Sequence, residues 1–139
     1  MTETTINPIL YIIMRSDIPD MNPGKLAAQA AHVASDFEMW VRTLESYSDQ
    51  YGEVLGEIAS WREGAKTCGV TICLSATKDE IRQAITKTDF SNSFSDPTYP
   101  WRNWYGETFL TNELTGAWFF VCNENSQDLA ILKEFSLHQ

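Results

Sequence analysis

The sequence predicts an α/β fold, in which helices cover both faces of a β-sheet to give a sandwich of three layers. Three observations carry this prediction: a buried-strand pattern at Ile9–Met14, a long amphipathic helix pattern at Pro23–Ser46, and the alternation of strand and helix patterns after them. The chain has 139 residues, which favours one domain with a substantial core over two small ones. We therefore expect residues 1–139 to form a single domain.

The first strand and the first helix have the clearest patterns. Ile9–Met14 is a continuous apolar run rich in branched residues, which indicates a strand buried on both faces between parallel neighbours. Asn22 can cap the helix that follows, and Pro23 suits its first position. The apolar side chains of this helix recur every three or four residues and form a stripe that faces the core: Leu26, Ala30, Val33, Phe37, Val41 and Leu44.

The rest of the chain alternates between helix and strand patterns. A second helix is expected at Gln50–Glu63, a strand at Lys66–Ala76, and a third helix from the capping residue Thr77 to Thr88. The segment Asp89–Tyr105 mixes polar residues and prolines with aromatic residues, which is typical of a long loop or an irregular strand. The remaining expected elements are strands and one helix, at Glu107–Thr111, Gly116–Cys122, Ser126–Lys133 (the helix) and Phe135–Leu137.

Net charge limits the partners of the chain. Its formal net charge of −9 and sequence pI near 4.5 argue against a broad basic surface for nucleic acid. A nucleic-acid site would therefore depend on a local group of cations, for which the candidates are Arg15, Lys25, Arg62, Lys66 and Arg102. The sequence has no apolar run as long as a membrane span and no basic segment ahead of an apolar one. We expect neither a membrane partner nor secretion.

Cysteine and histidine positions favour a protein without disulfides or metals. Cys68, Cys73 and Cys122 form no C-x-x-C pair, which favours reduced residues in the core of a cytoplasmic protein. His32 and His138 are far apart in the sequence, and no cluster of ligand residues surrounds either of them. No metal ion or other cofactor is expected.

Asn22–His32 is the segment that says most about function. Lys25, Gln29 and His32 follow one another at intervals of four and three residues, which places them within about 60° on one face of the helix. The positive end of the helix dipole disfavours a cation in the first turn, where Lys25 lies. An exposed lysine and a hydrogen-bonded histidine beside the core are the simpler interpretations. In the functional one, Lys25 holds a phosphate or an ester oxygen, and Asp36 fixes the tautomer of His32.

Residues 10–17 and 21–32 resemble the opening of the type-2 peptidyl-tRNA hydrolases. In that family a strand that ends in Arg and an Asp is followed by a Gly-Lys-x-Ala-Ala-Gln-x-x-His helix, and each of those residues is present here. The resemblance implies a small mixed β-sheet flanked by helices. It also implies hydrolysis of the ester that joins a peptide to tRNA, without a metal, by a protein that is commonly a dimer.

The second half of the chain follows the family less closely. There the family has Asp-Ala-Gly-x-Thr and later Gly-Thr ahead of an apolar strand. The closest counterparts here are residues 102–108 and 114–115, in which Thr108 and Thr115 match the two threonines. Asn103 or Trp104 stands where the family has the aspartate, and an amide cannot act as a carboxylate base. Asp96 could replace that aspartate only if its segment folds back.

The resemblance implies roles for individual residues. Those with catalytic roles would be Lys25, His32, Thr108 and Thr115. Those that bind the acceptor end of peptidyl-tRNA would be Gly24, Gln29, Arg15, Asn103, Trp101 and Trp104, the two tryptophans by stacking on bases. For the tryptophans, anchoring of a loop or a dimer contact is an equal alternative.

Two other functions stay open at this point. The replaced aspartate and the aromatic segment favour a catalytically impaired module that binds RNA or protein on the same fold. An esterase or amidase for small substrates would use the same cleft without any dependence on RNA.

Overall fold

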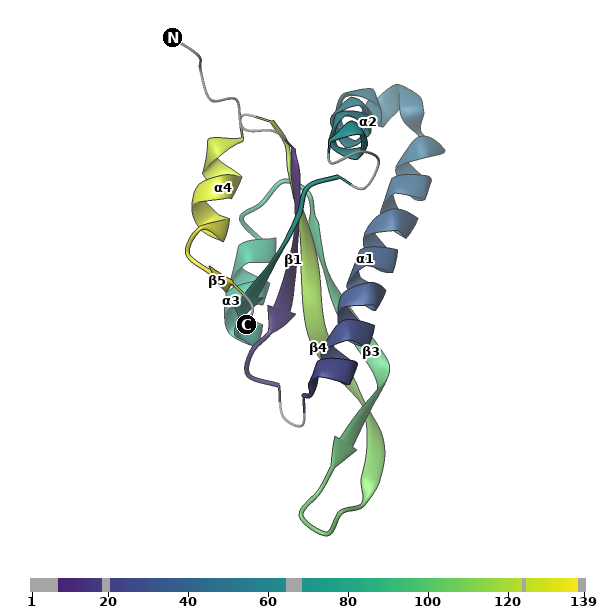
Figure 1. Cartoon of the computed structure of the whole chain (residues 1–139). Helices are drawn as coiled ribbons and strands as arrows, with labels where there is room; N and C mark the ends of the chain where they lie inside the picture. The colour runs from purple at the N-terminus through teal and green to yellow at the C-terminus, as the bar shows by residue number, and fades with distance from the viewer. Residues whose placement is uncertain (1–7, 19–20, 65–68, 124, 138–139) are drawn as a thin grey trace.

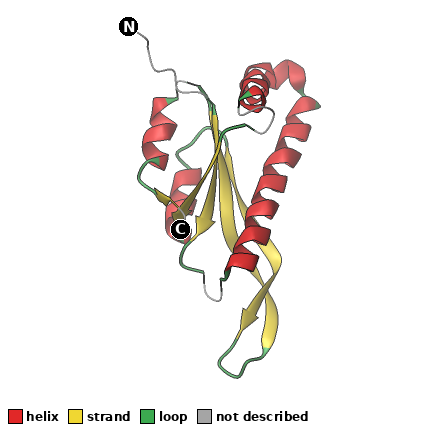
Figure 2. Cartoon of the chain, viewed as in Figure 1, coloured by secondary structure: helices red, strands yellow, loops and turns green. Residues whose placement is uncertain are grey.

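The computed structural model describes residues 8–18, 21–64, 69–123 and 125–137. Within these residues, five strands form one mixed sheet in the order β3-β4-β1-β2-β5. Helices α1 and α2 cover one face of the sheet, and α3 and α4 cover the other (Figure 1). The helices and strands of the three layers are distinguished by colour in Figure 2. The predicted α/β sandwich of three layers is confirmed.

Strand β1 (Ile9–Arg15) lies in the centre of the sheet. It runs parallel to β2 (Thr71–Ala76) and antiparallel to β4 (Thr108–Val121). The prediction of parallel neighbours is therefore correct on one side and wrong on the other, because a strand buried on both faces has the same apolar pattern in either direction. Alternate side chains of β1 enter the two cores, with Leu10, Ile12 and Met14 toward α1.

Helix α1 (Pro23–Glu45) begins and ends within one residue of the predicted bounds. Asn22 caps it, since its Oδ1 accepts a hydrogen bond of 2.9 Å from the backbone N–H of Lys25. Helix α2 (Ser48–Glu63) packs beside it, and the ring of Phe37 makes edge contacts with Trp61 and Trp118 in the core between α1, α2 and the sheet.

The far side of the sheet also agrees with the predicted order of elements. Helix α3 (Lys78–Ile85) starts with the predicted capping box of Thr77 and Glu80. Helix α4 (Ser126–Leu132) and the two-residue strand β5 (Ser136–Leu137) follow, and β5 pairs with β2. Among the described residues, no helix has both the length and the apolar composition that crossing a membrane requires.

Some predictions lie outside the described residues or are wrong. Lys66, Cys68 and His138 fall outside them. The prediction that all cysteines lie in the core is wrong for Cys73, which is exposed, whereas Cys122 is partly buried. Cys73 pairs with Ile12 and so lies on the same face of the sheet, but it is in β2 and does not belong to the core between that face and the helices α1 and α2.

The segment after α3 and the strand that follows it differ most from simple expectation. Strand β3 (Ser91–Arg102) lies where a long loop or an irregular strand was predicted, so the second alternative is correct, whereas β4 is one strand where two short ones were predicted. The two strands form a long hairpin whose outer part projects past the first turn of α1 (Figure 1). We call this outer part, residues 99–111, the ribbon.

Candidate functional site

An extra residue in β4 turns Thr115 toward α1. In the β3–β4 ladder Phe94 pairs with Gly116, and the next residue, Ser95, pairs with Leu114. Thr115 is therefore an extra residue opposite no partner, a β-bulge. Such a bulge re-aims the side chains that follow it, because side chains alternate between the two faces of a strand.

A second irregularity lies in β3. Asp96 pairs with Glu113 and Tyr99 pairs with Thr111, so that two residues of β3 lie opposite one of β4. As a result Asp96 and Tyr99, three positions apart, both face α1. The Tyr99 ring lies below the ammonium group of Lys25, 5.4 Å from the ring centroid.

The two bulges bring two distant residues together around Gln29. The Thr115 hydroxyl donates to Gln29 Oε1 at 2.8 Å, and Gln29 Nε2 donates to Asp96 Oδ2 at 2.7 Å. All three side chains are buried, with exposed fractions of 0% for Thr115, 4% for Gln29 and 8% for Asp96. The segment of Asp96 does fold back onto the α1 motif, which is the condition under which this carboxylate could replace the missing aspartate.

The charge of Asp96 sets the direction of these hydrogen bonds. Burial alone would raise the pKa of the Asp96 carboxyl, but hydrogen bonds from Gln29 and Thr98 and the nearby His32 outweigh it and hold that pKa below its ordinary value. An ionised carboxylate only accepts, so the Gln29 amide nitrogen must face it. Gln29 Oε1 then faces Thr115, whose hydroxyl must donate. The polar groups are thus fixed in a single arrangement.

Lys25 lies at the outer edge of this buried group. Its ammonium donates to the carbonyl oxygen of Pro100 at 3.1 Å and lies over the Tyr99 ring. Both partners belong to β3, three and four residues beyond Asp96. Lys25 is partly buried here, so the interpretation of a fully solvated surface lysine does not describe it. Gly24, exposed in the same first turn, leaves the helix N-terminus accessible.

His32 lies about two turns beyond Lys25 along α1. Its side chain is exposed and its ring stacks on Phe94, with 5.6 Å between the centroids. Asp36, the expected partner of His32, accepts hydrogen bonds of 2.9 Å from Asn92 Nδ2 and Trp118 Nε1. The carboxylate of Asp36 therefore ties α1 to the sheet, and the ring contact with Phe94 orients the imidazole.

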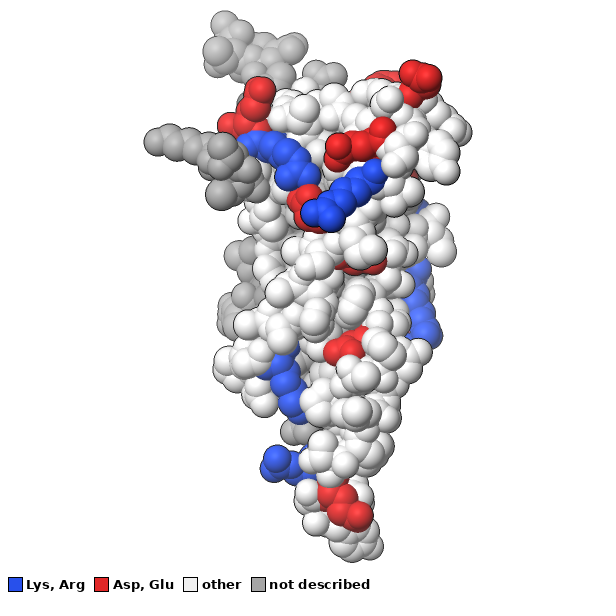
Figure 3. Space-filling view, turned by 90° about the vertical axis from the view of Figure 1, so that its right-hand side faces the viewer, with Lys and Arg blue, Asp and Glu red and all other residues white. Residues whose placement is uncertain are grey.

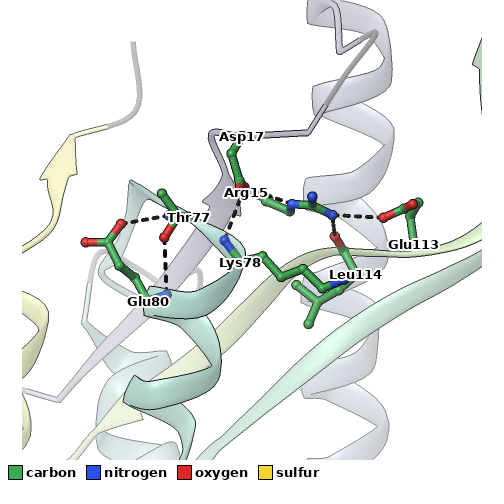
Figure 4. Close-up of polar contacts among 7 residues, drawn as sticks. All are labelled: Arg15, Asp17, Thr77, Lys78, Glu80, Glu113 and Leu114. Atoms are coloured by element: carbon green, nitrogen blue, oxygen red, sulfur yellow. Dashed lines mark hydrogen bonds and ion pairs between the residues drawn. The ribbon is translucent and has the colours of Figure 1, made fainter.

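Arg15 makes its ion pairs within the chain (Figure 4). Its Nε donates to Asp17 at 2.8 Å, and one terminal nitrogen donates to Glu113 at 2.8 Å and to the carbonyl oxygen of Leu114 at 3.1 Å. Asp17 also accepts from the backbone N–H of Lys78, the first residue of α3. Arg15 thus anchors the backbone next to the β4 bulge. These contacts indicate a structural role for Arg15 more than the predicted role in substrate binding.

The other sequence-predicted residues lie on the ribbon. Thr108 pairs with Arg102 near its tip. Thr115 follows Thr108 by seven positions along the strand, which is about 23 Å at the usual rise per residue. Asn103 Oδ1 accepts from the backbone N–H groups of Tyr105 and Glu107, so Asn103 shapes the turn. Neither Thr108 nor Asn103 joins the Gln29 hydrogen-bond group.

Trp101 and Trp104 have different surroundings on the ribbon. Trp101 is partly buried, and its ring stacks on that of Phe109 with 6.2 Å between centroids. Trp104 is 97% exposed. No local pattern identifies Tyr99 and Pro100 as contacts of Lys25, because their role comes from the register of β3 against α1.

No metal centre forms in the part of the chain that the structure describes, where no three His, Cys, Asp or Glu side chains come together to hold an ion.

A scan against protein-family models finds no match, and a search of the curated proteins finds none either. The functional interpretation therefore depends on the geometry above and on the motif in α1.

Proposed function

We propose that this chain is a peptidyl-tRNA hydrolase, which cleaves the ester between a peptide and tRNA. The observation that carries the proposal is the hydrogen-bonded group of Gln29, Asp96 and Thr115 directly below Lys25. It supplies a carboxylate beside the Gly-Lys-x-Ala-Ala-Gln-x-x-His helix, although no aspartate occupies the expected position in the sequence. The buried group gives rigid support, and Lys25 and His32 at its edge are the groups that can meet a substrate.

The reaction requires few functional groups. Water adds to the ester carbonyl carbon, negative charge develops on the carbonyl oxygen, and the ribose oxygen of tRNA leaves with a proton. The Lys25 ammonium, at the N-terminus of α1, stabilises that negative charge, and the helix dipole adds to the positive potential. Because an activated ester is an easy bond to hydrolyse, correct positioning and one cation supply much of the catalysis.

Asp96 serves as a positioning residue in this scheme. A carboxylate with a lowered pKa is a weak base, so it does not accept the proton of the attacking water. It acts through Gln29, whose orientation it fixes, and through the β3 backbone that supplies the Pro100 carbonyl to Lys25. Asp96→Asn should therefore lower kcat with little change in KM.

The first test is hydrolysis of a defined peptidyl-tRNA by purified wild-type protein and Lys25→Ala. Loss of an oxyanion-stabilising group lowers kcat by about 10²-fold. Lys87→Ala is the matched control, because Lys87 is an exposed lysine on the opposite face of the sheet. Equal kcat values for the two variants would contradict the role of Lys25, provided that circular dichroism shows both folded.

One observation favours the alternative of an impaired binding module. The Lys25 ammonium already donates to Pro100, and a substrate oxygen must compete with that carbonyl. A wild-type protein that binds tRNA but does not hydrolyse peptidyl-tRNA would support this alternative and refute the enzyme.

A further inference from the structure

Strand β4 has an open side along the ribbon. Its inner part, from Gly116 to Phe119, lies between β3 and β1. Strand β1 ends at Arg15, so residues 108–114 of β4 pair only with β3 among the described residues. No described strand continues the position of β1 along this outer part of the hairpin.

The turn of the hairpin shows which backbone groups face the open side. The Asn103 N–H donates to the Glu107 carbonyl oxygen at 3.0 Å, and such a pair recurs at every second residue of an antiparallel ladder. The register carries this alternation to Phe109 and Thr111, whose N–H and C=O groups therefore point to β3. The N–H and C=O groups of the alternate residues point away from β3, and we call them the open edge: those of Thr108, Leu110 and Asn112.

Arg15 closes the same side of β4 where β1 ends. Leu114, two residues after Asn112, directs its backbone groups to the same side, and its carbonyl oxygen accepts a hydrogen bond of 3.1 Å from the Arg15 guanidinium. The open edge has no such partner among the described residues.

The other side of the ribbon is closed to a further strand. Pro100, which lies opposite Leu110, has no N–H, and its carbonyl oxygen accepts from Lys25. Prolines and charged side chains on an edge strand prevent its pairing with another chain. Residues 108–112 contain no proline and no charge, and their threonines, phenylalanine and leucine favour a strand. Protection on one side only indicates that a strand binds on the other.

The side chains along the open edge describe the strand that fits it. Leu110 is 62% exposed and Phe109 is 45% exposed, so apolar residues opposite them would cover both. The Thr111 hydroxyl is buried and has no hydrogen-bond partner among the described residues. The residue opposite Thr111 would belong to a non-hydrogen-bonded pair, in which the side chains are closest. A serine or threonine there would supply the missing hydrogen bond.

Charge favours another protein over a second copy. The ribbon as a whole is neutral because Arg102 offsets Glu107, and Figure 3 shows mostly uncharged side chains at this lower end of the molecule. On β4, however, Glu107 and Glu113 flank the open edge, and Arg15 shares its one charge between Glu113 and Asp17. A second copy would bring the same glutamates and a net charge of −9. A strand with lysines at its ends complements them.

We propose that the open edge binds an extended segment of another protein, which adds to β4 as an antiparallel strand in line with β1. This segment is uncharged in its middle, has a hydroxyl residue opposite Thr111 and has basic residues at its ends. Backbone hydrogen bonds give the affinity, and the side-chain positions give the specificity. Because the open edge lies on the side of the ribbon away from Pro100 and Lys25, this binding does not depend on the proposed hydrolysis.

The probe is the fluorescein-labelled peptide Lys-Thr-Thr-Val-Val-Thr-Lys with blocked ends, whose binding is followed by fluorescence anisotropy. In the proposed register its first lysine lies opposite Glu113, and its fourth residue, a valine, lies opposite Leu110. Two control peptides carry one N-methyl group each. At the fourth residue this group replaces an N–H that faces the open edge, so binding should weaken about tenfold. At the fifth residue the N–H points away from β4, so binding should be retained.

Two proline variants of the protein test the same edge. Leu110→Pro removes an N–H of the open edge and keeps the hydrogen bonds between β3 and β4, because Leu110 and Pro100 form a pair that makes none. It should weaken binding of the probe about tenfold, whereas Leu110→Ala keeps the N–H and should lose less. Arg102→Pro is the matched control, since the Arg102 N–H points away from β4, and it should bind as wild type does.

The proposal is supported if Leu110→Pro and the first N-methyl peptide lose affinity while their controls do not, with circular dichroism showing each variant folded. It is overturned if wild-type protein does not bind the probe at millimolar concentration, or if Leu110→Pro binds it as wild type does. Sedimentation tests a second copy as occupant. A wild-type dimer that Leu110→Pro dissociates, together with no binding of the probe, would also overturn the proposal.

Discussion

Replacement of Asp96 by asparagine tests the centre of the site, because it removes the charge and keeps the shape. The carboxylate accepts three hydrogen bonds, from Gln29 Nε2 at 2.7 Å, from the Thr98 backbone N–H at 2.9 Å and from the Thr98 hydroxyl at 3.0 Å. Asparagine has an NH₂ group in place of one carboxylate oxygen, and this group donates where the carboxylate accepts. If its oxygen keeps the bonds from Thr98, its NH₂ group faces Gln29, and a hydrogen bond forms there only if Gln29 reverses its own amide.

The size of the effect follows from the number of bonds. A hydrogen bond to a charged group contributes about 1 kcal/mol more than one between neutral groups, so three of them give about 3 kcal/mol at neutral pH. Urea unfolding of wild type and Asp96→Asn measures this difference. Asp79→Asn, at an exposed position in the first turn of α3, should change stability by about 0.5 kcal/mol or less.

The dependence on pH gives a second, independent check. The pKa of Asp96 in the folded chain lies below its value in the unfolded chain. Its contribution to stability is therefore complete above the unfolded pKa of about 3.9 and is lost as the pH falls through the folded pKa. The difference between wild type and Asp96→Asn should be constant between neutral pH and about pH 5, and should shrink in more acidic solution. A difference that is absent at neutral pH, or that does not shrink in acid, would refute the ionised anchor.

Two further substitutions test the packing around the site by urea unfolding. Thr115→Val leaves Gln29 Oε1 buried without a donor and should cost about 1–3 kcal/mol, whereas Thr115→Ser keeps the hydroxyl; equal losses would show that the hydrogen bond is not the cause. Gly116→Ala places a Cβ 2.8 Å from the Ile13 carbonyl oxygen and should cost about 1–3 kcal/mol. The control is Gly56→Ala in α2, where a new Cβ meets nothing within 4 Å and should stabilise the folded chain by about 0.5–1 kcal/mol. If Gly116→Ala stabilised the chain as Gly56→Ala does, the close approach of Gly116 to Ile13 would be contradicted.

The elements with local signals could be predicted from the sequence. Asn22, Pro23 and the apolar stripe of α1 give its start and its buried face, and Thr77 with Glu80 gives the start of α3. These signals depend on residues within one or two turns. They do not depend on which strand lies next to which.

Strand β3 could not be predicted in the same way. Pro97 and Pro100 interrupt its pattern, and proline is tolerated in a strand mainly at the edge of a sheet, where no further strand needs its N–H. The order of strands places β3 at that edge. Only the complete sheet therefore decides between the two alternatives, a long loop or an irregular strand, that the sequence left open for this segment.

The candidate site was predicted in part, for a similar reason. The spacing in α1 placed Lys25, Gln29 and His32 on one face, but it could not show that only Gln29 is buried. Burial depends on the hairpin that packs against this face, and the bulge at Thr115 selects which hairpin residues reach it. Asp96 and Thr115 are 67 and 86 residues away from Gln29, beyond the reach of any local pattern.

Lys25 shows how the helix and the ribbon depend on each other. A cation in the first turn of a helix is disfavoured by about 0.3–1 kcal/mol. The Pro100 carbonyl and the Tyr99 ring offset this cost, because a hydrogen bond from a charged donor contributes about 1.5–3 kcal/mol and a cation–π contact about 0.5–2 kcal/mol. Both partners lie at the base of the ribbon. The position of the Lys25 ammonium therefore depends on the register of β3 as well as on α1, and for this reason the helix pattern alone could not show that Lys25 is partly buried.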